Sequence, residues 1–227
     1  MSKRVFQEAM ELLQAGRGGE AETMLLKEAS AIRALHGDNS REHAMALFDI
    51  ANLLTAADNL ERAIEFVRSA AEIEPDPGDD AACQDQLTYF RNLGELLEYA
   101  DRMDEAEDIL REGLRRRLSY YGREHPGYGF GLESLGELLW KKGEIDEALT
   151  LSQEAVDNLW NQENPQAFSA LALRGFVHVA AKKDGNPFAD IPRLNDENLE
   201  RIIKNMTFKS EFAEPAQSAE ALIHLYR

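Results

Sequence analysis

One short phrase centred on an alanine recurs four times along the chain at nearly constant spacing. The four copies read GRGGEAETML, DNLERAIEFV, DRMDEAEDIL and GEIDEALTLS. Their central residues are separated by 42, 43 and 42 residues and are Ala21, Ala63, Ala106 and Ala148. A constant period between about 20 and 50 residues is typical of stacked supersecondary units. The sequence therefore predicts a solenoid, a fold that generally works through an extended surface and not through a catalytic pocket.

Each repeat carries the apolar periodicity of two helices. Twelve residues before each central alanine stands a small residue, with an apolar residue four places before it and a leucine three places after it. This spacing is typical of a helix with one buried face. The small residues, where we expect the closest approach of two helices, are Ala9, Ala51, Gly94 and Gly136. The turns to the second helix are predicted at Gly18-Gly19, Asp58-Asn59, Asp101-Arg102 and Gly143-Glu144.

These positions resemble the tetratricopeptide repeat, in which bulky and small residues mark helix A and two small residues mark helix B. The phrase YYGREHPGYGFGLESLGELLWKKGEIDEALTLSQEAV is especially similar to the long variety, of roughly 42 residues, that kinesin light chains and many bacterial repeat proteins contain. The resemblance covers roughly residues 3 to 182. It implies an all-α fold, a right-handed α-α superhelix (a TPR solenoid) of about five helical hairpins with a helical C-terminal cap.

The repeat pattern and its loss divide the chain into two parts. We expect a tetratricopeptide repeat array over residues 1–185 and capping helices over residues 186–227. The repeats are expected at about 1–36, 37–78, 79–121, 122–160 and, as a partial repeat whose helix A starts at Pro165, 161–185. Terminal repeats are often atypical because they cap the exposed end of the core. The alternative is a C-terminal helix that folds into the groove and is displaced by a partner.

Composition limits the classes of partner and the compartment. The formal net charge is −17, which disfavours bulk binding to nucleic acid and to an anionic membrane surface. The N-terminal residues MSKRVFQEAMELL carry charges within their apolar stretch, unlike a secretory signal, and no apolar run is long enough to span a bilayer. A single cysteine, Cys83, fits a reducing compartment. We therefore expect a cytoplasmic protein.

The resemblance also implies where a partner would bind. Helix A of each repeat lines the concave face, with groove-facing positions just after the small residue and one turn before it. Carried onto this chain, with neighbours one turn later, these positions are Phe48, Asp49 and Asn52 in the second repeat, Arg91, Asn92, Glu95, Glu98 and Tyr99 in the third, and Phe130, Glu133, Glu137, Trp140 and Lys141 in the fourth. The groove is expected to be aromatic and acidic, and aromatic residues are typical of interaction surfaces.

The two groove asparagines allow a comparison with one familiar function. Co-chaperones of the family bind a C-terminal carboxylate with two asparagines and three cations, and Asn52 and Asn92 fall on the two asparagine positions. The cation positions, however, hold Phe48, Phe130 and Ser134. An acidic tail would therefore be repelled by the glutamates of the groove. The resemblance favours a basic or amphipathic protein or peptide, whose backbone the asparagine amides can bind.

No catalytic, metal or cofactor motif is recognisable in the sequence. The phrase GYGFG at residues 127–131 lacks the ending of a phosphate-binding loop, so Gly129 and Gly131 are interpreted as points of close helix approach. The five histidines lack metal-ligand spacing, and Cys83 is interpreted as inert. We expect no enzyme, no cofactor and no metal. A basic run comprises Arg111, Arg115, Arg116, Arg117 and Arg123. It is interpreted mostly as a solvated helix face, and contact with an acidic partner is the alternative.

The sequence thus predicts a protein- or peptide-binding scaffold or adaptor that uses its concave groove. Two alternatives stay open. One is a self-associating structural module, a homodimer formed through the exposed terminal helices. The other is a peptide-sensing regulator whose C-terminal helices move when the peptide binds.

Overall fold

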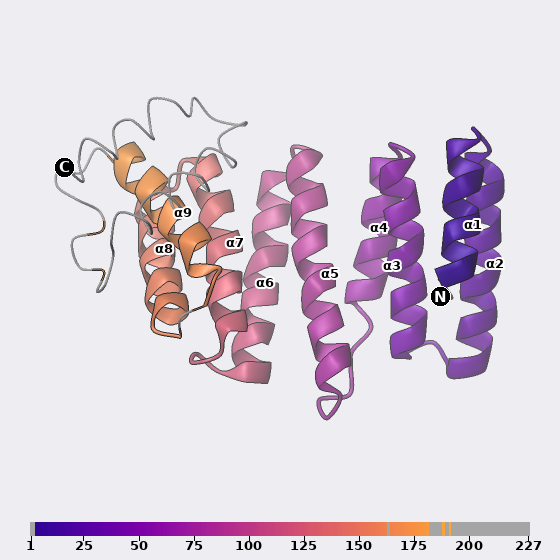
Figure 1. The fold of residues 1–227 in the computed structure, drawn as a ribbon, viewed down its shortest axis with the longest axis horizontal. Helices are drawn as coiled ribbons and strands as arrows, with labels where there is room; N and C mark the ends of the chain where they lie inside the picture. The colour runs from indigo at the N-terminus through magenta and orange to yellow at the C-terminus, as the bar shows by residue number, and fades with distance from the viewer. Residues whose placement is uncertain (1–2, 163, 182–187, 189–190, 192–227) are drawn as a thin grey trace. The chain divides into compact units, whose positions relative to one another are not determined.

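The computed structural model describes residues 3–162, 164–181, 188 and 191. The chain forms two compact units, an N-terminal unit (Met1–Arg116) and a C-terminal unit (Arg117–Arg227). Within the described ranges, every regular element is an α-helix, and consecutive helices form hairpins (Figure 1). The expected all-α fold of sequential helical hairpins is confirmed.

The N-terminal unit is a stack of hairpins. Its helices are α1 (Lys3–Gln14), α2 (Gly18–His36), α3 (Arg41–Ala56), α4 (Leu60–Ala71), α5 (Asp80–Tyr99) and the larger part of α6 (Met103–Tyr121). Each of α1 to α4 packs against the next helix in the chain, and α3 also contacts α1 and α5. The first helices of neighbouring hairpins therefore lie side by side (Figure 1).

The C-terminal unit contains the end of α6 together with α7 (Pro126–Lys142), α8 (Ile145–Trp160) and α9 (Ala167–Ala180). Helix α8 packs against both α7 and α9, and α7 also contacts α9. The helix expected from Pro165 begins at Ala167, because the Ala167 N–H donates to the Asn164 carbonyl in a preceding turn. Apart from the buried Phe188 and Ile191, the expected capping helices lie outside the described residues. The division into an array over 1–185 and a cap over 186–227 therefore stays a prediction.

The recurrent alanines are fully buried in the core. Each is 0% exposed, in the order Ala21, Ala63, Ala106 and Ala148. The small residues that precede them in each hairpin are buried as well. At Gly94 of α5, an added Cβ would lie 2.6 Å from Leu110 Cδ2 on α6. A side chain there would push two helices apart, because protein interiors are close-packed.

Each of the four complete hairpins turns through a residue with a positive φ. These residues recur at the intervals of the alanines and are Gly16 (74°), Asp58 (57°), Asp101 (59°) and Gly143 (84°). The N–H of the following residue donates to the carbonyl five places earlier, as in Asn59 to Leu54 at 2.8 Å and Arg102 to Leu97 at 2.9 Å. This is a Schellman motif, in which a left-handed residue ends the helix. The turn expected at Gly18-Gly19 is wrong by two residues, since α2 already begins at Gly18.

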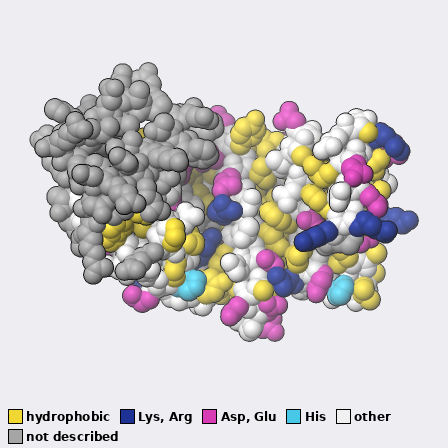
Figure 2. All heavy atoms as spheres, in the orientation of Figure 1, with side chains coloured by type: hydrophobic (Ala, Val, Ile, Leu, Met, Phe, Trp, Pro, Cys, Tyr) yellow, Lys and Arg dark blue, Asp and Glu magenta, His cyan; other side chains and the backbone are white. Residues whose placement is uncertain are grey.

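Ion pairs join neighbouring hairpins of the N-terminal unit. Arg41 Nε lies 2.7 Å from Asp85 Oδ2, and Arg102 Nη1 lies 3.1 Å from Glu61 Oε2. Three further pairs of this kind are Arg62 with Glu22, Arg68 with Glu105 (3.4 Å) and Arg116 with Glu74 (2.6 Å). In keeping with this pairing, Figure 2 shows acidic (magenta) and basic (dark blue) side chains interspersed over one face. Each pair links a hairpin to the one beside it.

Candidate functional site

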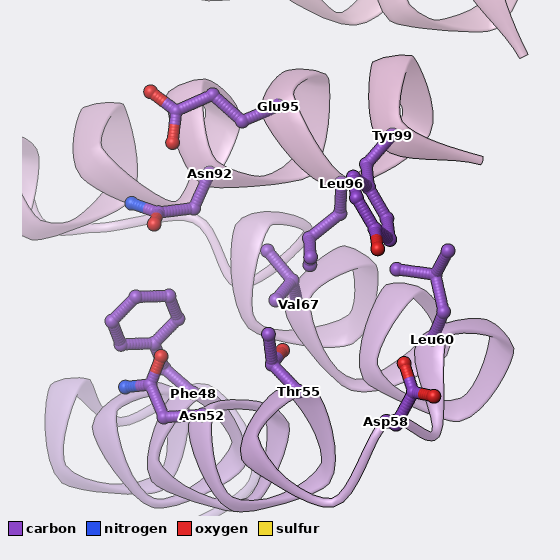
Figure 3. Close-up of a pocket in the computed structure, with 10 residues that line it drawn as sticks. All are labelled: Phe48, Asn52, Thr55, Asp58, Leu60, Val67, Asn92, Glu95, Leu96 and Tyr99. Atoms are coloured by element: carbon purple, nitrogen blue, oxygen red, sulfur yellow. The ribbon is translucent and has the colours of Figure 1, made fainter. Parts of the chain in front are cut away.

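A groove of about 400 Å³ lies between α3 and α5 of the N-terminal unit, with α4 beneath it (Figure 3). The groove exists because α3 and α5 are first helices of adjacent hairpins and touch each other, while α4 packs against both. Its lining consists of Phe48, Asn52 and Thr55 from α3, Asp58 from the turn, Leu60 and Val67 from α4, and Asn92, Glu95, Leu96 and Tyr99 from α5.

The groove brings together five of the residues predicted from the resemblance, namely Phe48, Asn52, Asn92, Glu95 and Tyr99. The two asparagines stand on opposite walls, Asn52 on α3 and Asn92 on α5 (Figure 3). Arg91, which was also predicted, is exposed, and its Nη1 lies 3.3 Å from Glu95 Oε1. The charge of Glu95 is therefore partly balanced by a neighbour on its own helix.

The asparagine amides present hydrogen-bonding atoms to the groove. Asn92 Nδ2 donates to the Thr88 carbonyl at 2.8 Å, which orients the side chain and leaves its Oδ1 to accept. Asn52 is exposed, and its amide has no hydrogen-bond partner among the residues that the structure describes. An amide both donates and accepts, so each asparagine can pair with a peptide group of an extended chain.

Two aromatic residues line the groove and differ in how exposed their side chains are. Phe48 is half-buried, and its ring packs on Tyr89 with the ring centroids 4.8 Å apart. Tyr89 is itself buried, and this burial raises the pKa of its hydroxyl, with the charge of Asp85 adding to the effect. Tyr99, by contrast, is 77% exposed. One aromatic ring is therefore held by the core, and the other is available to a partner.

Half of the lining was not predicted from the sequence, namely Thr55, Asp58, Leu60, Val67 and Leu96. The prediction carried over positions of helix A alone, whereas Asp58 belongs to the turn and Val67 to the second helix of the hairpin. One signal could have identified Asp58. Glycine occupies the equivalent turn position in the first and fourth hairpins, at Gly16 and Gly143, so the aspartate departs from the local conformational preference.

The predicted residues of α7 belong to the C-terminal unit, and two of them contact α9 there. Trp140 stacks on Phe176, with centroids 5.2 Å apart and planes inclined by 18°. Glu133 accepts a hydrogen bond from Ser169. The remaining predicted residues of α7 are Glu137 and Lys141, which pair at 3.3 Å, and the half-buried Phe130. Trp140 therefore packs between two helices, and a role for these residues in binding a partner stays a prediction.

Arg116, in the basic run of α6, is not part of a solvated face, and that interpretation is wrong for this residue. Its side chain is 15% exposed, and its guanidinium lies 5.1 Å above the Phe90 ring. It pairs with Glu74, and its Nη1 donates to Oε1 of the buried Gln86 at 2.9 Å. The hydrogen bond from Arg116 lowers the pKa of Glu74. Arg116 thus fastens the segment after α4 to α5 and α6.

Among the described residues, no cluster of three or more histidine, cysteine, aspartate or glutamate side chains is suited to a metal ion. Cys83 is buried, and this burial raises the pKa of its thiol. At Gly129 an added Cβ would lie 2.7 Å from Leu159 Cγ, which confirms a close helix approach there. None of the helices in the described ranges has the length and apolarity needed to cross a lipid bilayer.

Comparison with known proteins identifies relatives of the fold. Residues 85–159 match the sequence model of the tetratricopeptide repeat family. No curated protein has a sequence that matches this chain significantly. Among solved structures, the nearly identical TPR-like repeats of a kinesin light chain from Podosopora anserina align with a TM-score of 0.62. That alignment has 14% identity and covers 92% of this chain and 94% of the other.

Two further structures share the fold. BtubC (BKLC) from P. vanneervenii aligns with a TM-score of 0.65 at 17% identity, over 90% of this chain and 79% of its own. YrrB, a TPR protein with an unusual peptide-binding site, aligns with a TM-score of 0.53 at 14% identity, over 98% and 93%. Identities this low show that the fold is shared, and they carry no information about which partner each protein binds. Together with the buried alanines and the repeated Schellman turns, these matches show that residues 85–159 carry tetratricopeptide repeat sequence and that the chain has the fold of tetratricopeptide repeat proteins.

Proposed function

We propose that the chain is a scaffold whose groove between α3 and α5 binds an extended segment of a partner protein. Tetratricopeptide repeat proteins are generally protein-binding scaffolds and are usually not catalytic. The observation that carries the proposal is the pair of asparagines on opposite walls of one groove, beside an exposed tyrosine.

The amides match the needs of an extended backbone. Each peptide group of such a segment has a donor and an acceptor that must find partners when they leave water. Asn52 and the Oδ1 of Asn92 supply partners from two sides. The groove volume of about 400 Å³ falls within the range of about 300–1,000 Å³ that is typical of ligand clefts. A short segment can therefore be held by its backbone while its side chains enter the groove.

Charge and apolar area would select the segment. Asp58 and Glu95 both line the groove, and the formal net charge of −17 attracts basic chains at long range. The exposed ring of Tyr99 offers apolar contact with little loss of side-chain entropy. Basic or amphipathic segments are the partners that this combination favours.

Peptide pools provide the test. Degenerate heptapeptides, acetylated and amidated at their ends, are passed over the immobilised full chain, and the best-retained peptide is labelled for fluorescence anisotropy. We expect Asn52→Ala and Asn92→Ala each to weaken its binding by about fivefold, the value of about one hydrogen bond. Asn161→Ala is the matched control, because it removes an exposed asparagine at the end of α8, outside the groove. Failure of the unchanged chain to retain any peptide, or equal losses in all three variants, would contradict the proposal.

A further inference from the structure

Two of the four hairpin turns use aspartate where glycine is the least strained residue. The turn residues have φ between 57° and 84°, and the first and fourth are Gly16 and Gly143. Aspartate tolerates this left-handed region better than most side chains but less well than glycine. Asp58 and Asp101 therefore hold their turns in spite of a local conformational cost, and what they add is a carboxylate.

The carboxylate of Asp58 stands at an apolar end of the groove. Leu60 lies next to it, Leu96 and Tyr99 project from α5 on the other side of the groove, and Val67 lines the groove between α3 and α5 (Figure 3). Val67 is 1% exposed and Tyr99 is 77% exposed, so the floor belongs to the core while one wall is an open ring. In the part of the chain that the structure describes, the Asp58 carboxylate has no hydrogen-bond or ion-pair partner. A negative charge thus borders an apolar recess that leads in from solvent.

We propose that this recess, formed by Asp58, Leu60, Val67, Leu96 and Tyr99 and called the Asp58 pocket, is a specificity site for a lysine or arginine side chain of the bound segment. The inference rests on the proposed function, because the segment must first be held by the groove. The aliphatic stem of the basic side chain packs on the leucines and the valine. Its cationic head pairs with the Asp58 carboxylate and lies against the Tyr99 ring.

The same surroundings discriminate against other side chains. A carboxylate would be repelled by Asp58 and, one turn before Tyr99 on α5, by Glu95. An aliphatic side chain would cover the apolar floor but would remove Asp58 from water without giving it a partner, which is unfavourable. Arg91 does not supply that partner, because its guanidinium pairs with Glu95 at 3.3 Å. A basic side chain satisfies both the apolar floor and the carboxylate.

Four heptapeptide pools that differ only at their central residue measure this preference. The pools are blocked at both ends, are degenerate elsewhere, and carry lysine, arginine, norleucine or glutamate at the centre. We expect the full chain to retain the lysine and arginine pools about fivefold more strongly than the norleucine pool, the value of one favourable ion pair. The glutamate pool should be retained least. In Asp58→Asn, which keeps the side-chain shape and tolerates the positive φ, the lysine-to-norleucine ratio should fall to about one.

Asp101→Asn is the matched control for this test. It removes the same charge from the same kind of turn, with φ of 59°, and Asp101 does not line the groove. This variant should keep the preference for lysine, and circular dichroism verifies that both variants are folded. Equal retention of the lysine and norleucine pools by the unchanged chain would overturn the Asp58 pocket and leave the peptide-binding groove standing. An equal loss of the lysine preference in both variants would show that the preference comes from net charge, and it would overturn the Asp58 pocket. If the unchanged chain retained no pool, both proposals would be overturned.

Discussion

Alanine substitution at two equivalent glycines should have opposite effects on stability. Gly94 and Gly136 occupy the same small position in the third and fourth hairpins. A Cβ at Gly94 would lie 2.6 Å from Leu110 Cδ2 and 2.8 Å from its Cγ, which is an overlap. At Gly136 the nearest atom, Leu173 Cδ2, would be 3.4 Å away, which is an ordinary contact. The same substitution is therefore tolerated in one hairpin and obstructed in the other.

Two opposing contributions determine the magnitudes. Replacing glycine by alanine inside a helix stabilises it by about 1 kcal/mol. Overfilling a packed core costs about 1–3 kcal/mol, and Leu110 is only 9% exposed, so its Cγ and its methyl group must both move within the core. We expect Gly136→Ala to raise the free energy of unfolding by about 0.5–1 kcal/mol. Gly94→Ala should lower it by about 1 kcal/mol, which leaves a difference of about 2 kcal/mol between the variants.

Urea unfolding of the full chain measures this difference. Far-ultraviolet circular dichroism follows both variants. Tryptophan fluorescence reports Gly136→Ala separately, because Trp140 and Trp160 both lie in the C-terminal unit with Gly136. If Gly94→Ala were as stable as the unchanged chain or more stable, contact with Leu110 would not limit the helix spacing, and the argument from close packing would be refuted.

Three further predictions concern the groove and its support. Asp58→Gly should raise the free energy of unfolding by about 0.5–1 kcal/mol in urea, because glycine relieves the positive φ, and should abolish the lysine preference of the peptide pools. Tyr99→Ala should leave thermal unfolding unchanged, because the side chain is 77% exposed, and should weaken peptide binding by about fivefold in the anisotropy assay. Arg116→Met should lower the free energy of unfolding by about 2 kcal/mol near neutral pH. This loss should shrink in acid, because Arg116 lowers the pKa of Glu74 from its ordinary 4.5. The stability linked to this shift is present above pH 4.5 and disappears as the pH falls through the lowered pKa. Urea titrations at neutral pH and at a pH below the lowered pKa would measure the difference.

The positions of the core residues could be predicted from the period of the alanines, but the space available around each small residue could not. Periodicity identifies Gly94 and Gly136 as equivalent, and both are buried. Only the structure shows that Leu110 crowds one of them while Leu173 merely touches the other. The distance between a small residue and the side chain opposite it depends on how two helices cross, and a spacing along one helix carries no information about that crossing.

The groove could be predicted in part, for a related reason. Helix periodicity selects the face of α3 that carries Asn52 and the face of α5 that carries Asn92, and both line the groove. Asp58 reaches the same groove from a turn, which has no face to select. Likewise, the pattern of charges could not assign a partner to Arg116, because Glu74 lies 42 residues away in an irregular segment.

The ion pairs between hairpins make the N-terminal unit a chain of nearest-neighbour couplings. All five span 37 to 44 residues, so each joins a hairpin only to the next one. The stability of a solenoid is approximately a sum of contributions within repeats and contributions between neighbours. Dissolved salt screens exposed charges but leaves the alanine-lined contacts untouched, so it weakens the coupling more than the hairpins themselves. We therefore expect a higher ionic strength to weaken the coupling between the hairpins of this unit and to broaden its unfolding transition as well as lower its midpoint.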